Sequence, residues 1–144
     1  SDVCSSDLGL YHYAPREHAL ELRAELDASS RVPRGGLLAI LTSVVWRESW
    51  KYGERAFRYC QHDVGHALVA LRHAASLLGW AATVLPQWSD DATAHVLGLD
   101  RTADYDGAER EEAECLILVG DPDVAGVGKM LTKIVAQQAA VPKV

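Results

Sequence analysis

A long apolar periodicity between residues 54 and 78 constrains the fold of this chain more than any other feature. Apolar side chains recur there every three or four residues, at Phe57, Cys60, Val64, Leu68, Leu71, Ala75 and Leu78. With 3.6 residues per turn, this spacing puts them on one face of an α-helix of about seven turns. Gly79 follows directly, and glycine favours the left-handed position that ends a helix. The pattern predicts a long helix with one face on a core.

The segments before this helix predict strands. Residues 9–13 (GLYHY) and 18–22 are extended in character, and the turn-like residues 14–17 separate them, so we expect a β-hairpin. Residues 22–27 are interpreted as one or two helical turns, and residues 29–36 as a loop. Residues 37–46 (LLAILTSVVW) form a continuous apolar run rich in β-branched side chains. Such a run predicts a central strand covered on both faces.

After the helix, the pattern is again mixed. Residues 80–85 predict a strand, and Ser89-Asp90-Asp91 predicts the capped start of a short helix that runs to Leu97. Residues 101–112 are charged and predict a loop, and residues 114–119 (ECLILV) predict a last strand. Strands and helices in this irregular order indicate the α+β class.

The two ends of the chain differ in character from residues 9–120, which we interpret as one partial domain. Residues 1–8 (SDVCSSDL) are small and polar and are expected to be a non-native or disordered tail. Residues 121–144 are interpreted as a linker and C-terminal extension, with a candidate helix at residues 129–140. Residues 126–130 (GVGKM) lack the first glycine and the Ser or Thr of a phosphate-binding loop, so that motif is excluded.

Charge and cysteine content narrow the function classes. The net charge of −6 argues against broad electrostatic binding to nucleic acid or to an anionic membrane. No apolar run is long enough to span a membrane. The three cysteines, Cys4, Cys60 and Cys115, are odd in number and far apart, which favours free thiols in a reducing cytoplasm over disulfides.

Basic and aromatic side chains gather in residues 46–59 (WRESWKYGERAFRY), where the predicted strand ends and the long helix begins. Such edges often carry binding and catalytic residues. Lys51 and Tyr52 can each transfer a proton as acid or base. Arginine forks that suit phosphate or carboxylate come from Arg47, Arg55 and Arg58. The alternative is a solvated helix start in which Glu54 and Arg58 form an i, i+4 ion pair.

His62 and His66 are spaced i, i+4, which places both imidazoles on one face of the helix, as in helical zinc sites. The third ligand would have to be His73, His95 or Cys60. Cys60 lies about 200° around the helix from His62, and Asp63 is one methylene shorter than the glutamate of helical zinc proteases. We therefore expect no metal, and interpret both histidines as helix or interface residues.

From residue 9 to residue 120 the chain resembles the nitroreductase superfamily, in particular its SagB-type branch, which includes thiazole/oxazole-forming peptide dehydrogenases. The segments that carry the resemblance are GLYHYAPREHALELR, WKYGERAFRYCQHDVGHALVALRHAASLLGW, SDDATAHVLGLD and ECLILVG. The resemblance implies a nitroreductase-like α+β fold, with a central antiparallel or mixed sheet and a long helix that serves both core and dimer interface.

The resemblance also implies a function. Members are homodimers or tandem pseudo-dimers that bind FMN between subunits and act on a small-molecule or peptide substrate, as in azoline-to-azole oxidation or related two-electron chemistry. By the same likeness, Lys51 or Tyr52 would remove a ring proton while the flavin takes the hydride. The flavin contacts that it implies are Arg47, Gly53, Arg55, Pro86 and Gln87.

Two departures from the family pattern lead to an alternative prediction of function. The family's segment that binds the FMN phosphate would lie upstream of residue 9, so we expect the chain to be a piece of a longer protein. Where relatives have a glycine-rich turn near the flavin, this chain has residues 84–88 (VLPQW), and Pro86 lacks a backbone N–H. The alternative is a degenerate, non-catalytic module that dimerises or binds a peptide or partner.

Overall fold

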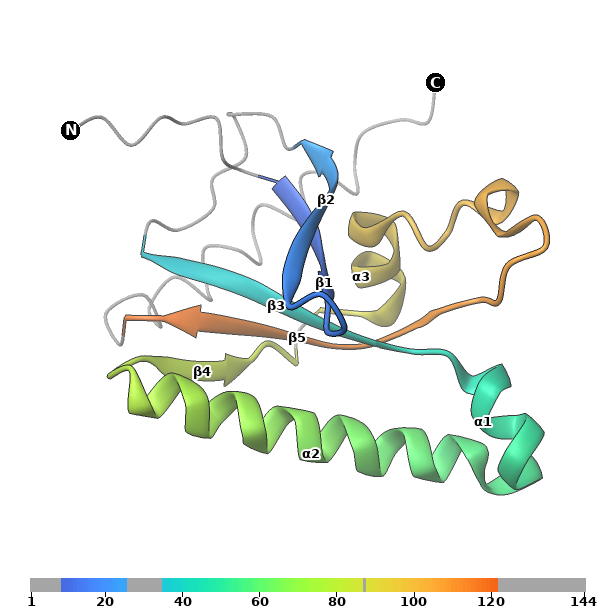
Figure 1. Cartoon of the computed structure of the whole chain (residues 1–144), viewed down its shortest axis with the longest axis horizontal. Helices are drawn as coiled ribbons and strands as arrows, with labels where there is room; N and C mark the ends of the chain where they lie inside the picture. Colours follow the sequence, from blue (N-terminus) through green and yellow to red (C-terminus); the bar gives the residue numbers. More distant parts are fainter. Residues whose placement is uncertain (1–8, 26–34, 87, 122–144) are drawn as a thin grey trace. The chain divides into compact units, whose positions relative to one another are not determined.

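A computed structural model of the chain describes residues 9–25, 35–86 and 88–121. The chain divides into two compact units, residues 1–32 and residues 33–144. The first unit contains β1 (Gly9–Ala14) and β2 (Ala19–Glu25). The second contains β3 (Gly36–Ser43), α1 (Val45–Tyr52), the 3₁₀ turn η1 (Gly53–Arg55), α2 (Ala56–Leu77), β4 (Ala81–Val84), α3 (Asp90–Leu97), the 3₁₀ turn η2 (Thr102–Tyr105) and β5 (Glu112–Gly120). These elements confirm the α+β class (Figure 1).

The first unit is the expected β-hairpin. β1 and β2 are antiparallel, and Tyr11 and Tyr13 lie opposite Leu22 and Leu20 on the neighbouring strand. Cross-strand aromatic and aliphatic pairs of this kind stabilise antiparallel strands. The helical turn expected at residues 22–27 is wrong for residues 22–25, which continue β2 because they have strand partners in β1. Residues 26–27 lie outside the described residues.

The sheet of the second unit has the order β3-β5-β4, and both outer strands run antiparallel to β5. The expectation of a central strand at residues 37–46 is therefore wrong, because the described sheet has β5 in its middle and β3 on its edge. Five successive residues of β5, from Leu116 to Gly120, are buried, whereas β3 is mostly half-buried. Both strands are continuous apolar runs, and only their pairing distinguishes them.

Alternate side chains of β5 enter two separate clusters. Leu116 and Leu118 pack with Leu85, Leu38, Ile40 and Trp88 on one face. Ile117 and Val119 pack on the other face with Ala75, Leu68 and Leu71 of α2. This alternation follows from the two-residue period of a strand. Figure 1 shows α2 along one face of the sheet and α3 on the other side.

The long helix α2 forms as predicted, within two residues at its start and one at its end. The middle of the predicted apolar face is buried or half-buried, from Cys60 through Ala75. Its two ends are exposed instead: Phe57 has 64% and Leu78 70% of its surface accessible. The prediction that these two residues face the core is wrong. The periodicity predicts which face of the helix points toward the core, but it does not predict how much of the helix length the sheet covers.

The chain leaves the sheet earlier than predicted. The strand expected to reach Trp46 ends at Ser43, where β3 pairs with Glu112 after an irregularity between Leu41 and Thr42. Val45 and Trp46 begin α1, in which the Ser49 hydroxyl donates a hydrogen bond to the Val45 carbonyl oxygen over 3.0 Å. β-propensity depends on strand neighbours, and these residues have none. The cluster at residues 46–59 therefore lies on a helix–turn–helix.

The remaining predicted elements are close to those observed. β4 occupies the middle of the strand expected at residues 80–85. The Ser89 hydroxyl accepts a hydrogen bond from the Ala92 N–H over 3.2 Å, which confirms the predicted helix cap. η2 interrupts the charged loop expected at residues 101–112.

Candidate functional site

The predicted proton carriers Lys51 and Tyr52 are the last two residues of α1, directly before a tight turn at Gly53. Gly53 has φ = 56° and ψ = −130°, and its N–H donates to the Ser49 carbonyl oxygen. An L side chain rarely adopts this positive φ, so glycine permits the chain to reverse from α1 into α2. The turn leaves both predicted proton carriers exposed.

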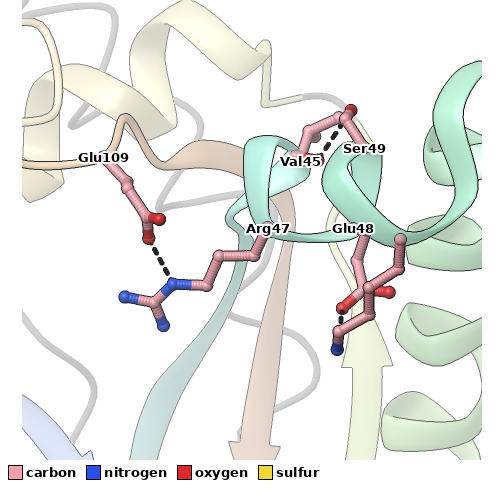
Figure 2. Close-up of polar contacts among 6 residues, drawn as sticks. Val45, Arg47, Glu48, Ser49 and Glu109 are labelled. Carbon is pink, nitrogen blue, oxygen red and sulfur yellow. Dashed lines mark hydrogen bonds and ion pairs between the residues drawn. The ribbon is translucent and has the colours of Figure 1, made fainter.

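Two ion pairs hold the charged side chains of α1. Lys51 Nζ lies 3.6 Å from Glu48 Oε1, one turn earlier on the same helix. Arg47 Nε donates to Glu109 Oε2, which belongs to the loop before β5. Figure 2 shows Arg47 reaching away from α1 toward Glu109, while Glu48 lies on a different side of the helix. The Arg47 fork, a predicted phosphate ligand, is therefore engaged by a carboxylate.

An aromatic contact joins α1 to α2. The ring centroids of Tyr52 and Tyr59 are 4.5 Å apart, and the ring planes are tilted by 42°. This lies within the range of favourable aromatic pairs. Tyr52 is 46% and Tyr59 39% exposed, so both hydroxyls remain reachable from solvent.

A pocket of about 290 Å³ lies beside this aromatic pair, lined by Arg55, Arg58, Tyr59 and His62. Arg55 ends the 3₁₀ turn, and the other three belong to the first two turns of α2. Their spacing of i, i+3, i+4 and i+7 places all four on one helix face. The i, i+4 pair between Glu54 and Arg58, which belonged to the alternative interpretation of this cluster, does not form. In the described parts of the chain, neither pocket arginine has an ion-pair partner.

The two histidines proposed as alternative metal ligands are exposed. His66 Nδ1 lies 3.9 Å from Asp63 Oδ1, and both side chains are about four-fifths accessible, at 84% and 79%. His62 lines the pocket of arginines instead. Over residues 9–25, 35–86 and 88–121, no group of three His, Cys, Asp or Glu side chains comes together in a way that could hold a metal ion.

The structure separates the predicted flavin contacts into two places. Gly53 and Arg55 lie at the α1–α2 turn, whereas Pro86 follows β4 and is exposed. The last pairs of β3 and β4 are Ser43 with Glu112 and Val84 with Ile117, five residues apart along β5. This corresponds to about 17 Å along the sheet. Gln87 lies outside the described residues.

Cys60, in the second turn of α2, is a buried thiol near this region. It is 4% exposed, and burial and the carboxylates of Glu114 and Glu48 raise the pKa of its thiol. A hydrogen bond with Ser43 opposes this shift. Cys115 is half-buried, and burial raises its pKa too. Cys60 and Cys115 are both free, and Cys4 lies outside the described residues.

Sequence reasoning named the arginines, placed Tyr59 in the same cluster and considered His62 as a metal ligand, but it did not group the four. Tyr59 and His62 join Arg55 and Arg58 in the pocket, and the i, i+3, i+4, i+7 spacing was the signal that could have grouped them. The partners Glu48 and Glu109 were also missed. Glu48 lies one turn from Lys51, but Glu109 is 62 residues from Arg47 and no local pattern connects them.

Comparison with known proteins adds no family to these observations. No family model, curated protein or solved structure matches the chain. Within the described helices, none is both long enough and apolar enough to cross a membrane.

Proposed function

We propose that this chain is part of a cytoplasmic, FMN-dependent oxidoreductase of the nitroreductase superfamily, of the SagB type, that acts on a peptide azoline or a related small molecule. The observation that carries the proposal is the placement of Lys51 and Tyr52. Both end a short helix, both are solvent-accessible, and Tyr52 touches an aromatic side chain of a cationic pocket. A proton donor or acceptor must be within reach of its substrate, and this turn provides that access.

The residues at the α1–α2 turn fit part of FMN. Arg55 contributes a fork that suits a phosphate, and an added Cβ at Gly53 would have no neighbour within 4 Å, so a ligand can approach the backbone. The pocket of about 290 Å³ is at the lower end of the range of about 300–1,000 Å³ for small-molecule sites. A whole flavin therefore needs further residues, from another segment or a second subunit.

A second subunit is part of the proposal, as a homodimer or tandem pseudo-dimer. Apolar side chains remain accessible along α2, with Phe57 at 64%, Val69 at 54% and Leu77 at 89%. Val84, the last residue of β4, lies about 17 Å along the sheet from Ser43, the last residue of β3, so the two strands that lead to Pro86 and to Tyr52 end at different positions along β5. Pairing two copies through the solvent-facing side of α2 would cover Val69 and Leu77 and supply a second set of contacts.

Within this proposal, Lys51 and Tyr52 have separate roles. FMN, when bound, supplies two-electron oxidation. Tyr52, whose ring contacts Tyr59, would act as the phenolate, which accepts the proton that the substrate carbon loses and becomes the phenol. Lys51 is held by Glu48, and its ammonium group stabilises negative charge that develops beside Tyr52.

The test is FMN binding and turnover by the full chain. We expect bound flavin absorbance after incubation with FMN and gel filtration, and loss of turnover without loss of flavin in Tyr52→Phe. Tyr13→Phe, which removes the same hydroxyl from the separate hairpin, is the matched control and should retain turnover. Protein that elutes colourless after incubation would contradict the proposal.

A non-catalytic module that dimerises or binds a partner is the second candidate. The exposed apolar residues of α2 and the engagement of Arg47 by Glu109 favour it. It predicts self-association in sedimentation velocity together with no flavin uptake. Flavin turnover that Lys51→Ala abolishes would argue against it.

A further inference from the structure

Four donor side chains of the α1–α2 turn converge without a carboxylate among them. Arg55, Arg58, Tyr59 and His62 line the pocket, and all four are exposed. Some arginines elsewhere in the chain are paired with acids. Arg47 and Arg23, for example, each contact a glutamate. The two pocket arginines form no such pair with any described residue, and both line the pocket.

The donors of this pocket match a group with several oxygens. Each arginine can donate two parallel hydrogen bonds, and the imidazole and the phenol can each donate one more. A carboxylate has two oxygens, whereas a phosphate monoester offers three strong acceptors and a charge of about −1.5 to −2 near neutral pH. The number of donors and the local positive charge therefore favour phosphate over carboxylate.

The size of the pocket leaves room beside the phosphate. At ~30 Å³ per water, about 290 Å³ corresponds to roughly ten water molecules, more than a phosphate fills. The remaining wall is the Tyr59 ring, which stacks near Tyr52. A ligand in which a phosphate is joined to an organic group would use both the cations and the ring.

From this geometry we propose that Arg55, Arg58, Tyr59 and His62 form a binding site for a phosphate monoester. The phosphate belongs to FMN or to another phosphorylated ligand, and the two sources share the same chemistry at the pocket. The site binds inorganic phosphate by itself, so its existence does not depend on flavin chemistry.

The test is a titration of the full chain with inorganic phosphate at constant ionic strength, followed by the NMR signals of the arginine Nε–H groups. We expect saturable shifts at Arg55 and Arg58. Arg55→Ala or Arg58→Ala should each weaken binding about tenfold, and the double variant should abolish it. Arg72→Ala is the matched control, because Arg72 is an exposed arginine of the same helix outside the pocket.

Three results would overturn the site. One is no saturation by phosphate, and another is equal weakening by Arg72→Ala, which would indicate general charge attraction. The third is acetate binding as tightly as phosphate. Circular dichroism checks that each variant keeps its helices. Comparing the binding of FMN with that of riboflavin identifies the source of the phosphate. FMN is the ligand if Arg58→Ala weakens the affinity for FMN and leaves the affinity for riboflavin unchanged. Another phosphorylated molecule is the ligand if inorganic phosphate binds and neither flavin does.

Discussion

The rings of Tyr52 and Tyr59 lie with their centroids 4.5 Å apart, which ties the last residue of α1 to the first turn of α2. Tyr52 is the proposed proton acceptor, and Tyr59 is a wall of the pocket of arginines. One contact therefore connects the two proposed activities of this region. A ligand that displaces Tyr59 would also change the environment of Tyr52.

The contact between these rings contributes to stability as well as to position. Tyr59→Ala should lower the free energy of unfolding by about 1 kcal/mol, because an aromatic pair contributes roughly 0.5–1.5 kcal/mol beyond its buried area. Tyr59→Phe keeps the ring and should stay close to the parent. Urea unfolding measures both. Equal losses in the two variants would show that the hydroxyl, and not the ring contact, matters.

The glycines Gly53 and Gly65 should respond to alanine in opposite directions. Gly53 has φ = 56°, so Gly53→Ala should destabilise the protein by about 1–3 kcal/mol through backbone strain. Gly65 is inside α2, and a Cβ there meets nothing within 4 Å, so Gly65→Ala should stabilise by about 0.5–1 kcal/mol. The thermal unfolding midpoints of the two variants, compared with the parent, test this prediction. If both variants are less stable than the parent, a side chain must pack against Gly65, contrary to the prediction.

Local patterns predicted most elements of this fold, and their failures share a cause. The hairpin, α2, β4 and α3 follow from periodicity, turn chemistry and a cap, all of which act over a few residues. The order of the sheet does not, because β3 and β5 are both apolar runs and their pairing spans much of the chain. The early end of β3 also depends on its partner, since pairing stops where Glu112 begins β5.

The candidate site, like the fold, was predictable only where its residues are close together in the sequence. The cluster at residues 46–59 places Lys51, Tyr52 and Arg55 together because they are close in sequence. Whether an arginine is engaged or available was not predictable, since the partner of Arg47 comes from the loop before β5. The separation of Pro86 from this turn likewise required the register of β4 on β5.

A prediction about the hydrophobic core concerns Ile117, whose side chain has no accessible surface. Ile117→Ala should cost about 2–5 kcal/mol and Ile117→Val about 0.5–1.5 kcal/mol, because each leaves a cavity between the sheet and α2. Leu37→Ala is the control, because Leu37 on the edge strand β3 is 47% exposed and should lose less than about 1 kcal/mol. Urea unfolding that ranks Leu37 above Ile117 would contradict the strand order.

The buried thiol of Cys60 predicts a loss of stability in alkaline solution. Its pKa in the folded protein is raised above the ordinary value of 9.0, chiefly by burial and then by Glu114. The folded state therefore holds the proton more tightly, and this stabilisation is complete below pH 9.0 and is lost as the pH rises through the folded pKa. The stability difference between the parent and Cys60→Ala should narrow above this pH. A constant difference in urea unfolding would contradict it.

The ion pair between Arg47 and Glu109 should be weak, because 68% and 35% of the two side chains are exposed. A double-mutant cycle with Arg47→Ala and Glu109→Ala should give a coupling of about 0.2–1 kcal/mol. Added salt should reduce it, since solvent screens exposed charges. A larger coupling that salt leaves unchanged would indicate a pair shielded from solvent.

The middle place of β5 in the described sheet determines when that sheet can form during synthesis. β3 and β4 leave the ribosome first, but neither pairs with the other, and both need the strand that ends at Gly120. Their apolar side chains therefore remain without a sheet until that last strand is available. A chain stalled before Glu112 would expose them, and it is such nascent chains that should bind chaperones most strongly.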